Sequence, residues 1–266
     1  WQVTLCDYLI HQGYGASPLL YGDTVIVCAD HKGGGALAAL DRRTGRVAWK
    51  RERPPTPNYS SPIVFRLFGR DQLVLTGCDR VISYDPATGT TLWEREGATT
   101  ECVTTPVTDG ERIFTSGGYP KNHVSAVRAD GSATIDWENG EREYVPSMIL
   151  HEGHLYGVLD AGIAVCWNAA TGAERWKSRL GGNFSASPVL ANGTIYATNE
   201  AGAAVESQAL IRGRVTGVEM YDGAPYLVIG DSILPLSTVI SLNEITDRAD
   251  NDDTEKPDVP TEEAAA

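Results

Sequence analysis

The sequence predicts an all-β fold, namely a β-propeller of four-stranded antiparallel blades. Three observations support this prediction: a recurring Asp/Asn-x-x-Thr-Gly-x-x-x-Trp string, a recurring step from a small residue to proline, and four short apolar runs in each repeat. Each repeat is roughly 42 residues long, the length of a propeller blade with four strands. We expect about four complete blades plus partial ones, arranged in an incomplete ring.

Two independent markers share one period. Tryptophans end the four repeats at spacings of 44, 44 and 39 residues, at Trp49, Trp93, Trp137 and Trp176. The proline steps recur at similar spacings, at Ser17-Pro18, Ser61-Pro62, Thr105-Pro106, Val145-Pro146 and Ser187-Pro188. Complete units are therefore expected at 16–49, 60–93, 104–137 and 145–176, and a fifth begins at 184–205. Trp1 is expected to close a preceding blade.

Four strands are expected in each unit. A short apolar run follows the proline, and a polar turn such as Asn192-Gly193 leads to a second run. The second runs read TVIVCA, QLVLTG, RIFTSG, HLYGVL and TIYATN. A third run enters the Thr-Gly string and a fourth carries the tryptophan. Turns of this kind between strand-like runs are hairpin signals.

The repeated string is expected to close the last hairpin of each blade. The side chains of Asp41, Asp85 and Asn168 can accept hydrogen bonds from the turn. Glycine adopts the positive φ that the turn needs at Gly45, Gly89 and Gly172. Hydroxyl groups are added by Thr44, Thr88 and Thr171. The third copy has lost this register and carries Asp130-Gly131 two residues early, so its turn is expected to be rebuilt.

The string resembles the pyrroloquinoline-quinone (PQQ)-like β-propeller repeats over about residues 1–205. Their hallmark, A-x-D-x-x-T-G-x-x-x-W, is matched fully by residues 39–49, whereas the second and fourth copies lack the leading alanine. The resemblance implies that each tryptophan docks between blades. It also implies a setting outside the cytoplasm, in the periplasm or cell envelope, where some relatives are scaffolds for outer-membrane protein assembly.

The C-terminal part departs from the repeat. Residues 206–246 are expected to form a divergent β meander or closing element, with strands in RVTGVEM, APYLVIG and ILPLSTVISL and a short helix over Gly202–Leu210. The segment is loosely similar to β segments of flagellar hook-scaffold proteins, which leaves a fusion with such a module as an alternative. Residues 247–266, with eight acidic and two basic residues, are expected to be disordered.

Composition narrows the classes of function. The net charge of −13 argues against a nucleic-acid partner. The sequence contains no run of 18 apolar residues, so we expect no transmembrane segment. The five cysteines are scattered and form no C-x-x-C pair, so we expect small buried side chains and not a disulfide framework or zinc site.

No catalytic, cofactor-binding or metal-binding residue is expected. The alternative is a fragment of a PQQ-dependent quinoprotein dehydrogenase, which by resemblance would bind PQQ and Ca²⁺. However, no adjacent cysteine pair and no recognisable Glu, Asn and Asp cluster is present. His151-Glu152-Gly153-His154 is expected to be a hairpin turn, and DHKGGG (30–35) a flexible hairpin loop.

The loops outside the repeat carry the candidate binding face. In a propeller such loops gather at one end, where binding faces usually lie. The candidates are His11, Tyr14, Glu101, Tyr119, His123 and Phe184; the alternative is that these are ordinary turn and inter-strand residues. We expect a non-catalytic scaffold that holds protein partners through these loops or through an open sheet edge.

Overall fold

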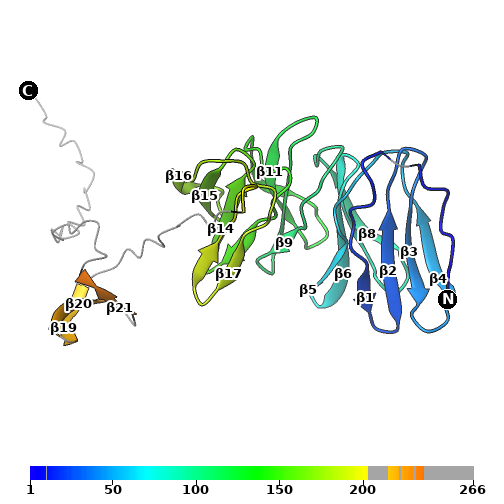
Figure 1. Cartoon of the computed structure of the whole chain (residues 1–266). Coiled ribbons are helices and arrows are strands. Elements are labelled where there is room, and N and C mark those ends of the chain that lie inside the picture. Colours follow the sequence, from blue (N-terminus) through cyan, green and yellow to red (C-terminus); the bar gives the residue numbers. More distant parts are fainter. Residues whose placement is uncertain (10, 203–214, 222, 230–231, 237–266) are drawn as a thin grey trace, which may run out of the picture. The chain divides into compact units, whose positions relative to one another are not determined.

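The computed structural model describes residues 1–9, 11–202, 215–221, 223–229 and 232–236 (Figure 1). The chain divides into two compact units, Trp1–Ala209 and Leu210–Ala266. The regular elements of the described residues are β-strands, as the predicted all-β class requires. Most of the expected short helix (203–210) and the whole acidic tail (247–266) lie outside the described residues.

The first unit contains four blades, each a four-stranded antiparallel meander. The first blade comprises β1 (Leu19–Tyr21), β2 (Thr24–Ala29), β3 (Ala36–Asp41) and β4 (Val47–Glu52). The second comprises β5 (Ile63–Leu67), β6 (Arg70–Gly77), β7 (Arg80–Tyr84) and β8 (Thr91–Glu96).

The next two blades repeat this order. The third comprises β9 (Val107–Thr108), β10 (Arg112–Gly117), β11 (His123–Arg128) and β12 (Ile135–Asn139). The fourth comprises β13 (Ile149–His151), β14 (His154–Leu159), β15 (Ile163–Asn168) and β16 (Glu174–Arg179). A hairpin of β17 (Val189–Ala191) and β18 (Thr194–Tyr196) follows as a partial fifth blade.

Burial within a blade follows strand position. The second and third strands are almost wholly buried, as in β3 (ALAALD) and β6 (RDQLVLTG), because consecutive blades pack face to face. The fourth strands are largely exposed and rich in charge, as in β4 (VAWKRE) and β16 (ERWKSR). Small and β-branched residues therefore occupy the middle of each blade, and charged residues occupy its outer edge.

A β-bulge recurs in all four blades, one residue before the tryptophan. In the first blade Ala39 pairs with Trp49 while Leu40 pairs with Val47, which leaves Ala48 as the extra residue. The same register shift occurs in the other three blades. Because a bulge bends its strand and redirects side chains, it helps to aim each tryptophan out of its own sheet.

The hydrophobic core consists of separate clusters between consecutive blades. One cluster joins the first and second blades, a second joins the second and third, and a third joins the third and fourth. A small fourth cluster joins the fourth blade to the partial fifth. Among the described residues no cluster joins the first blade to β17 and β18, so the blades form an incomplete ring, as predicted.

The starts of the blades correct one sequence marker. The backbone N–H of Ser17 donates to Ser61 Oγ (2.8 Å), and that of Ser147 donates to Ser187 Oγ (2.9 Å). In the same way, the N–H of Thr105 donates to Ser147 Oγ (3.0 Å). Ser147 therefore holds the position that the Val145-Pro146 step was expected to mark, two residues further on.

The second unit contains a separate three-stranded sheet of β19 (Val215–Tyr221), β20 (Ala224–Ile229) and β21 (Ser232–Pro235). These strands coincide with the first two predicted C-terminal runs and with the beginning of the third. Most side chains of β19 are exposed, and Leu227 of β20 is buried. In the part of the chain that is described, no helix has the length and hydropathy needed to span a membrane.

Candidate binding sites at the seams between blades

The repeated turns have a common hydrogen-bond pattern. Asp41 Oδ1 accepts from the backbone N–H groups of Arg43 (3.1 Å) and Thr44 (2.8 Å) and from the Thr44 hydroxyl (2.8 Å). These bonds hold the pKa of Asp41 below its usual value. Asn168 makes the same set of bonds to its own turn, and Asp85 accepts from the N–H of Ala87. The turn glycines have φ of 74° (Gly45), 70° (Gly89) and 70° (Gly172).

We call the contact between two consecutive blades a seam, and the tryptophan clasps the first and third of them. At the first seam, between the first and second blades, Trp49 lies over Gly89, where an added Cβ would come within 2.6 Å of its ring. The indole N–H of Trp49 donates to Pro86 O (3.0 Å). At the third seam Trp137 lies over Gly172 and donates to Ala169 O (2.8 Å).

Trp1 makes the same contacts with the first blade. Its ring lies over Gly45, and its indole N–H donates to Arg42 O (3.0 Å). In the fourth blade, Trp176 is 46% exposed. Among the described residues no Thr-Gly turn follows to cover it.

The second seam is clasped differently. Ala133, with φ of 52°, stands where the other copies have glycine. The Trp93 N–H donates within its own blade to Gln72 Oε1 (2.7 Å), and Gln72 Nε2 crosses the seam to Ala129 O (2.9 Å). Ser83 Oγ also donates to Gln72 Oε1 (2.9 Å). The third turn is rebuilt around Ala133, and a buried glutamine relays the hydrogen bond across the seam.

The two ends of the blades carry different turns and loops. Antiparallel order places the Thr-Gly turns at one end, which we call the turn end. The connections between blades and the loops after β2, β6, β10 and β14 lie at the opposite end, the connection end. All six residues of the predicted binding face lie at the connection end.

Three of these six candidates, Tyr14, Tyr119 and His11, lie at the surface. Tyr14 is 51% exposed and Tyr119 is 54% exposed, and His11 Nδ1 lies 3.1 Å from the hydroxyl of Tyr59. Glu101 is buried, forms an isolated β-bridge with Tyr119 and accepts a hydrogen bond from the Tyr144 hydroxyl (3.2 Å).

Phe184 and His123, like Glu101, lie in the interior. Phe184 is 1% exposed and packs with Val158 and Ala197 in the core between the fourth blade and the partial fifth. His123 is 7% exposed, and neither of its ring nitrogens has a hydrogen-bond partner among the residues that the structure describes. Burial lowers the pKa of His123 to about 4, so its imidazole is neutral at pH 7.

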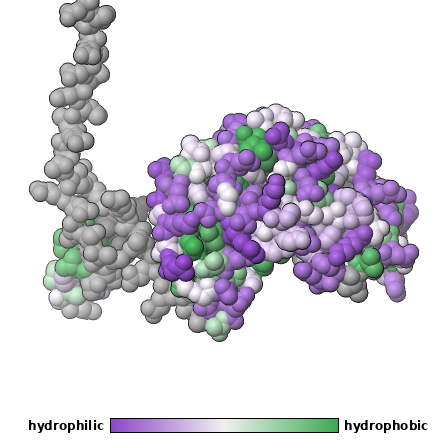
Figure 2. Space-filling view, turned by 90° about the horizontal axis from the view of Figure 1, so that it is seen from above, coloured by the Kyte–Doolittle hydropathy of each residue, from purple (hydrophilic) through white to green (hydrophobic). Residues whose placement is uncertain are grey.

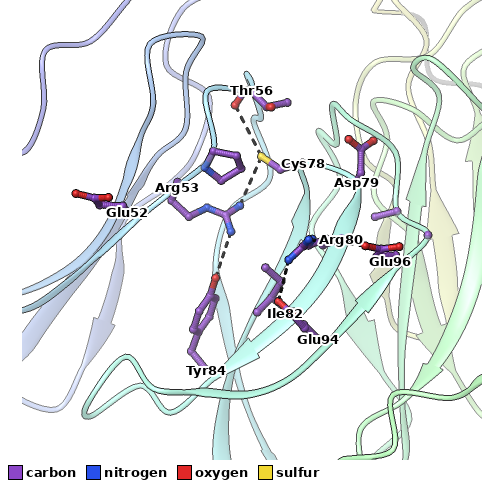
Figure 3. Close-up of a pocket in the computed structure, with 13 residues that line it drawn as sticks. Glu52, Arg53, Thr56, Cys78, Asp79, Arg80, Ile82, Tyr84, Glu94 and Glu96 are labelled. Carbon is purple, nitrogen blue, oxygen red and sulfur yellow. Dashed lines mark hydrogen bonds and ion pairs between the residues drawn. The ribbon is translucent and has the colours of Figure 1, made fainter.

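The first seam contains a cavity of about 740 Å³ at the connection end (Figure 3). Arg53, the first residue after β4, extends into it and forms a buried bidentate ion pair with Asp30 (2.9 Å for each N–O contact). The guanidinium also reaches across the seam to the Tyr84 hydroxyl (3.2 Å) and to Cys78 Sγ (3.7 Å), as Figure 3 shows. Burial, with Asp30 next in importance, raises the pKa of Cys78 to about 12, so this thiol is a poor nucleophile at neutral pH.

The sequence did not identify Asp30 and Arg53 as paired residues. The expected flexible loop over 30–35 begins with two buried side chains, Asp30 and His31. His31 Nδ1 accepts from the backbone N–H groups of Leu9 (3.2 Å) and Gly33 (3.0 Å). The available signal was a charged residue placed directly after the apolar run VIVCA (25–29).

Glu143 is a second buried acid that sequence reasoning missed. Its side chain is fully buried beside Gly157, and neither carboxylate oxygen has a hydrogen-bond partner in the described part of the chain. Burial raises its pKa well above the usual range, with a smaller contribution from Asp160.

The cysteines and the histidine-rich turn are structural features. Four cysteines are buried, Cys6 is half-buried, and all five are free thiols. The HEGH string forms the tight turn between β13 and β14, with positive φ at Glu152 and Gly153. Within the described ranges no three His, Cys, Asp or Glu side chains are grouped so that they could hold a metal ion.

Comparison with known proteins gives one family. The family described as "Outer membrane protein assembly factor BamB" matches residues 1–164 and 152–223. This match agrees with the resemblance to PQQ-like repeats. None of the curated proteins matches the chain in sequence.

Solved structures share the fold at low identity. BamB from Moraxella catarrhalis superposes with a TM-score of 0.55 at 18% identity, covering 82% of this chain and 70% of that one. Quinohemoprotein alcohol dehydrogenase from Comamonas testosteroni gives 0.54 at 14% identity, covering 80% of this chain and 45% of that one. A europium-containing methanol dehydrogenase gives 0.50 at 13% identity, covering 81% of this chain and 54% of that one. At such identities these likenesses support the propeller fold alone.

Proposed function

We propose that this chain, which belongs to the outer membrane protein assembly factor BamB family, is a non-catalytic scaffold that binds a protein partner in the bacterial cell envelope. The observation that carries the proposal is the family match, which spans the blades and reaches residue 223. The repeated turn and tryptophan residues then act as structural clasps, and binding falls to side chains outside the repeat.

The connection end is the better of two surfaces for a partner. Tyr14 and Tyr119 are exposed there, and tyrosine is enriched in protein interfaces because one ring offers apolar area and a hydroxyl group. Tyr119 is held by its bridge to Glu101, so part of this surface is ordered before binding. Over the face seen in Figure 2, hydrophilic side chains predominate and hydrophobic ones form small separate groups, as suits a polar interface.

The outer strands are a weaker choice. β4, β8 and β16 each pair on one side only, so each has a free edge within its sheet. These strands read VAWKRE, TLWERE and ERWKSR. Charged residues on an edge strand disfavour the addition of a further strand. We therefore assign binding to the connection end and not to a sheet edge.

Site-specific photo-crosslinking tests this assignment. A benzophenone amino acid replaces Tyr119 at the connection end or, as the matched control, exposed Arg43 at the turn end, in cells that make the protein naturally. We expect one discrete protein adduct from position 119 and none from position 43. Equal adducts from both positions, or none from either, would exclude a scaffold that binds through its connection end.

The dehydrogenase alternative has a separate test. The purified chain is incubated with PQQ and Ca²⁺ and assayed for alcohol-dependent reduction of an electron-accepting dye. A scaffold shows no reduction above that of PQQ and Ca²⁺ alone. Turnover that depends on the chain would replace the scaffold proposal.

We also propose that the chain is organised as propeller repeats over 1–205, a separate β element over 206–246 and an acidic tail over 247–266. The independent sheet of β19, β20 and β21 supports the middle boundary. An excised 206–246 peptide should show a β-sheet circular dichroism spectrum. A random-coil spectrum would mean that this segment needs the rest of the chain to fold, and it would remove the fusion with a hook-scaffold-like module.

A further inference from the structure

The three-stranded sheet of the second unit exposes many apolar side chains and buries few (Figure 1). Leu227 is the one buried side chain among those described in residues 215–236. The large apolar side chains that are exposed in this range are those of Val215, Val218, Met220, Tyr221, Ile233 and Leu236. A small sheet with little buried apolar area is marginally stable by itself, and exposed apolar residues gathered in one place indicate a contact with another protein surface.

The two edge strands of this sheet differ in how well they resist the addition of a further strand. β21 has four residues and ends at Pro235, which has no N–H to donate to a neighbouring strand. β19 has seven residues and no proline, and among the described residues it pairs only with β20. Glu219 is the single charged residue of the three strands, whereas β4, β8 and β16 of the blades each carry three or more. The edge of β19 therefore lacks the charges that disfavour strand addition at the blades.

The regular part of this edge is Gly217–Tyr221. The pairing of β19 with β20 shifts between Val215 and Gly217, and it is regular from Gly217 onwards. Because a bulge bends its strand, we expect an added strand to pair along the regular part. Val218 is 62% exposed and Met220 is 63% exposed, and both lie on one face of the sheet because alternate residues of a strand share a face.

The sequence of β19 suits antiparallel pairing with a second copy of itself. A two-fold axis through Val218 places Val218 opposite Val218 of the second copy and Glu219 opposite Gly217. Met220 then lies diagonally across from Val218 of the second copy, within reach of a long side chain. The Glu219 carboxylate accepts a hydrogen bond from the Tyr221 hydroxyl (2.6 Å), and the glycine opposite leaves it room to keep this partner. An axis through Glu219 would instead place two carboxylates opposite each other, which is unfavourable.

We propose that two copies of this chain associate through antiparallel pairing of β19, with Val218 at the two-fold axis, so that their sheets form one six-stranded sheet. The main-chain hydrogen bonds of the two edges are satisfied, and Val218 and Met220 lose contact with water. The interface is isologous and closes at two copies, because each copy uses its β19 edge and the β21 edges end in Pro235. The inference goes beyond the scaffold function, since a dimer carries two propellers and can hold a multivalent partner more tightly than one propeller.

The test is the oligomeric state of the full chain, measured by sedimentation velocity over a series of concentrations. We expect a reversible equilibrium between monomer and dimer. Val218→Lys places two ammonium groups opposite each other and should raise the dissociation constant of the dimer about tenfold. Leu20→Lys changes a residue of the first blade that is 69% exposed, and as the matched control it should leave the constant unchanged. A chain that stays monomeric throughout, or equal effects of the two substitutions, would overturn the inference.

Disulfide cross-linking tests the position of the axis. Opposite residues of an antiparallel pair are close enough for a disulfide, so Val218→Cys should give a covalent dimer on mild oxidation. Tyr221→Cys is the control, because the two copies of a residue three positions from the axis lie about 20 Å apart. The unsubstituted chain shows the contribution of the five natural cysteines, of which four are buried and Cys6 is half-buried. Equal cross-linking at positions 218 and 221, or a dimer that is not cross-linked at position 218, would show that β19 does not pair in this way.

Discussion

The first and second seams join blades of the same architecture with different chemistry. At the turn end, Trp49 lies over Gly89 and donates to a backbone carbonyl, whereas Trp93 faces Ala133 and needs Gln72 as a relay. At the connection end, Arg53 forms a buried ion pair, whereas Gly97 borders a cavity that is also lined by His123. The difference indicates that the repeat specifies where blades meet, while residues outside the repeat decide the chemistry of each seam.

The largest expected effect concerns the buried ion pair of Asp30 and Arg53 at the first seam. Asp30→Ala leaves the Arg53 guanidinium buried without its carboxylate and should lower the free energy of unfolding by about 3–5 kcal/mol. Glu94→Ala, which removes an exposed partner of Arg80, is the matched control and should cost less than about 1 kcal/mol. Urea denaturation gives both values. Equal small losses would mean that the first seam does not depend on its ion pair.

Adding a side chain at the glycine under the Trp49 ring should also destabilise the first seam. Gly89→Ala places a Cβ against the Trp49 ring at a residue with φ of 70°, so we expect a loss of about 2–4 kcal/mol in the free energy of unfolding. Ala133→Gly at the second seam relieves a positive φ but removes a buried methyl group. It should change stability by less than about 1 kcal/mol. Thermal denaturation measures both variants. A larger loss of stability in Ala133→Gly than in Gly89→Ala would contradict the conclusion that the two seams are clasped differently.

The second seam should be sensitive to acid. The pKa of His123 is about 4 in the folded chain and near 6.5 when unfolded, so between these values the unfolded chain binds more protons. Stability due to His123 is therefore complete above pH 6.5 and falls by about 3 kcal/mol as the pH drops to 4. The measurement is the difference in unfolding free energy between the natural chain and His123→Phe across this range. A difference that does not change with pH would show that His123 is not buried in its neutral form.

The smallest of these effects concerns the glutamine relay. Gln72→Leu removes the acceptor of the Trp93 N–H and the donor to Ala129 O, and should lower the free energy of unfolding by about 2 kcal/mol. Thr24 holds the equivalent place in the first blade, where Trp49 needs no relay. Thr24→Val should therefore cost less than about 1 kcal/mol in the same urea titration. Equal costs would mean that Gln72 has no special part in the second seam.

The repeated part of the fold could be predicted from the sequence because the residues that determine each blade lie close together in the chain. The hairpin turns, apolar runs and tryptophans lie within about 40 residues of one another, and the blades contain the expected strands. The Val145-Pro146 marker was misplaced because proline is not needed where Ser147 makes the hydrogen bond to Ser187.

The site was harder to predict because its residues meet only through the fold. Arg53 and Asp30 are 23 residues apart in the chain, and neither belongs to the repeated string. Phe184 was grouped with exposed loop residues because an aromatic side chain in a loop looks the same in sequence whether it is buried or exposed. The neutral state of His123 depends on its burial, which the sequence does not state.

The indole N–H groups of Trp1, Trp49 and Trp137 all donate to main-chain carbonyl oxygens, those of Arg42, Pro86 and Ala169. These three acceptor residues have unrelated side chains. The hydrogen bond depends only on the position of the backbone carbonyl group, so the side chain of the acceptor residue can vary. A foreign blade with the same turn should accept the same tryptophan hydrogen bond, provided that its facing side chains fill the hydrophobic cluster at the seam. The surface of each blade is thereby free to acquire new binding properties without a change in how the propeller is assembled.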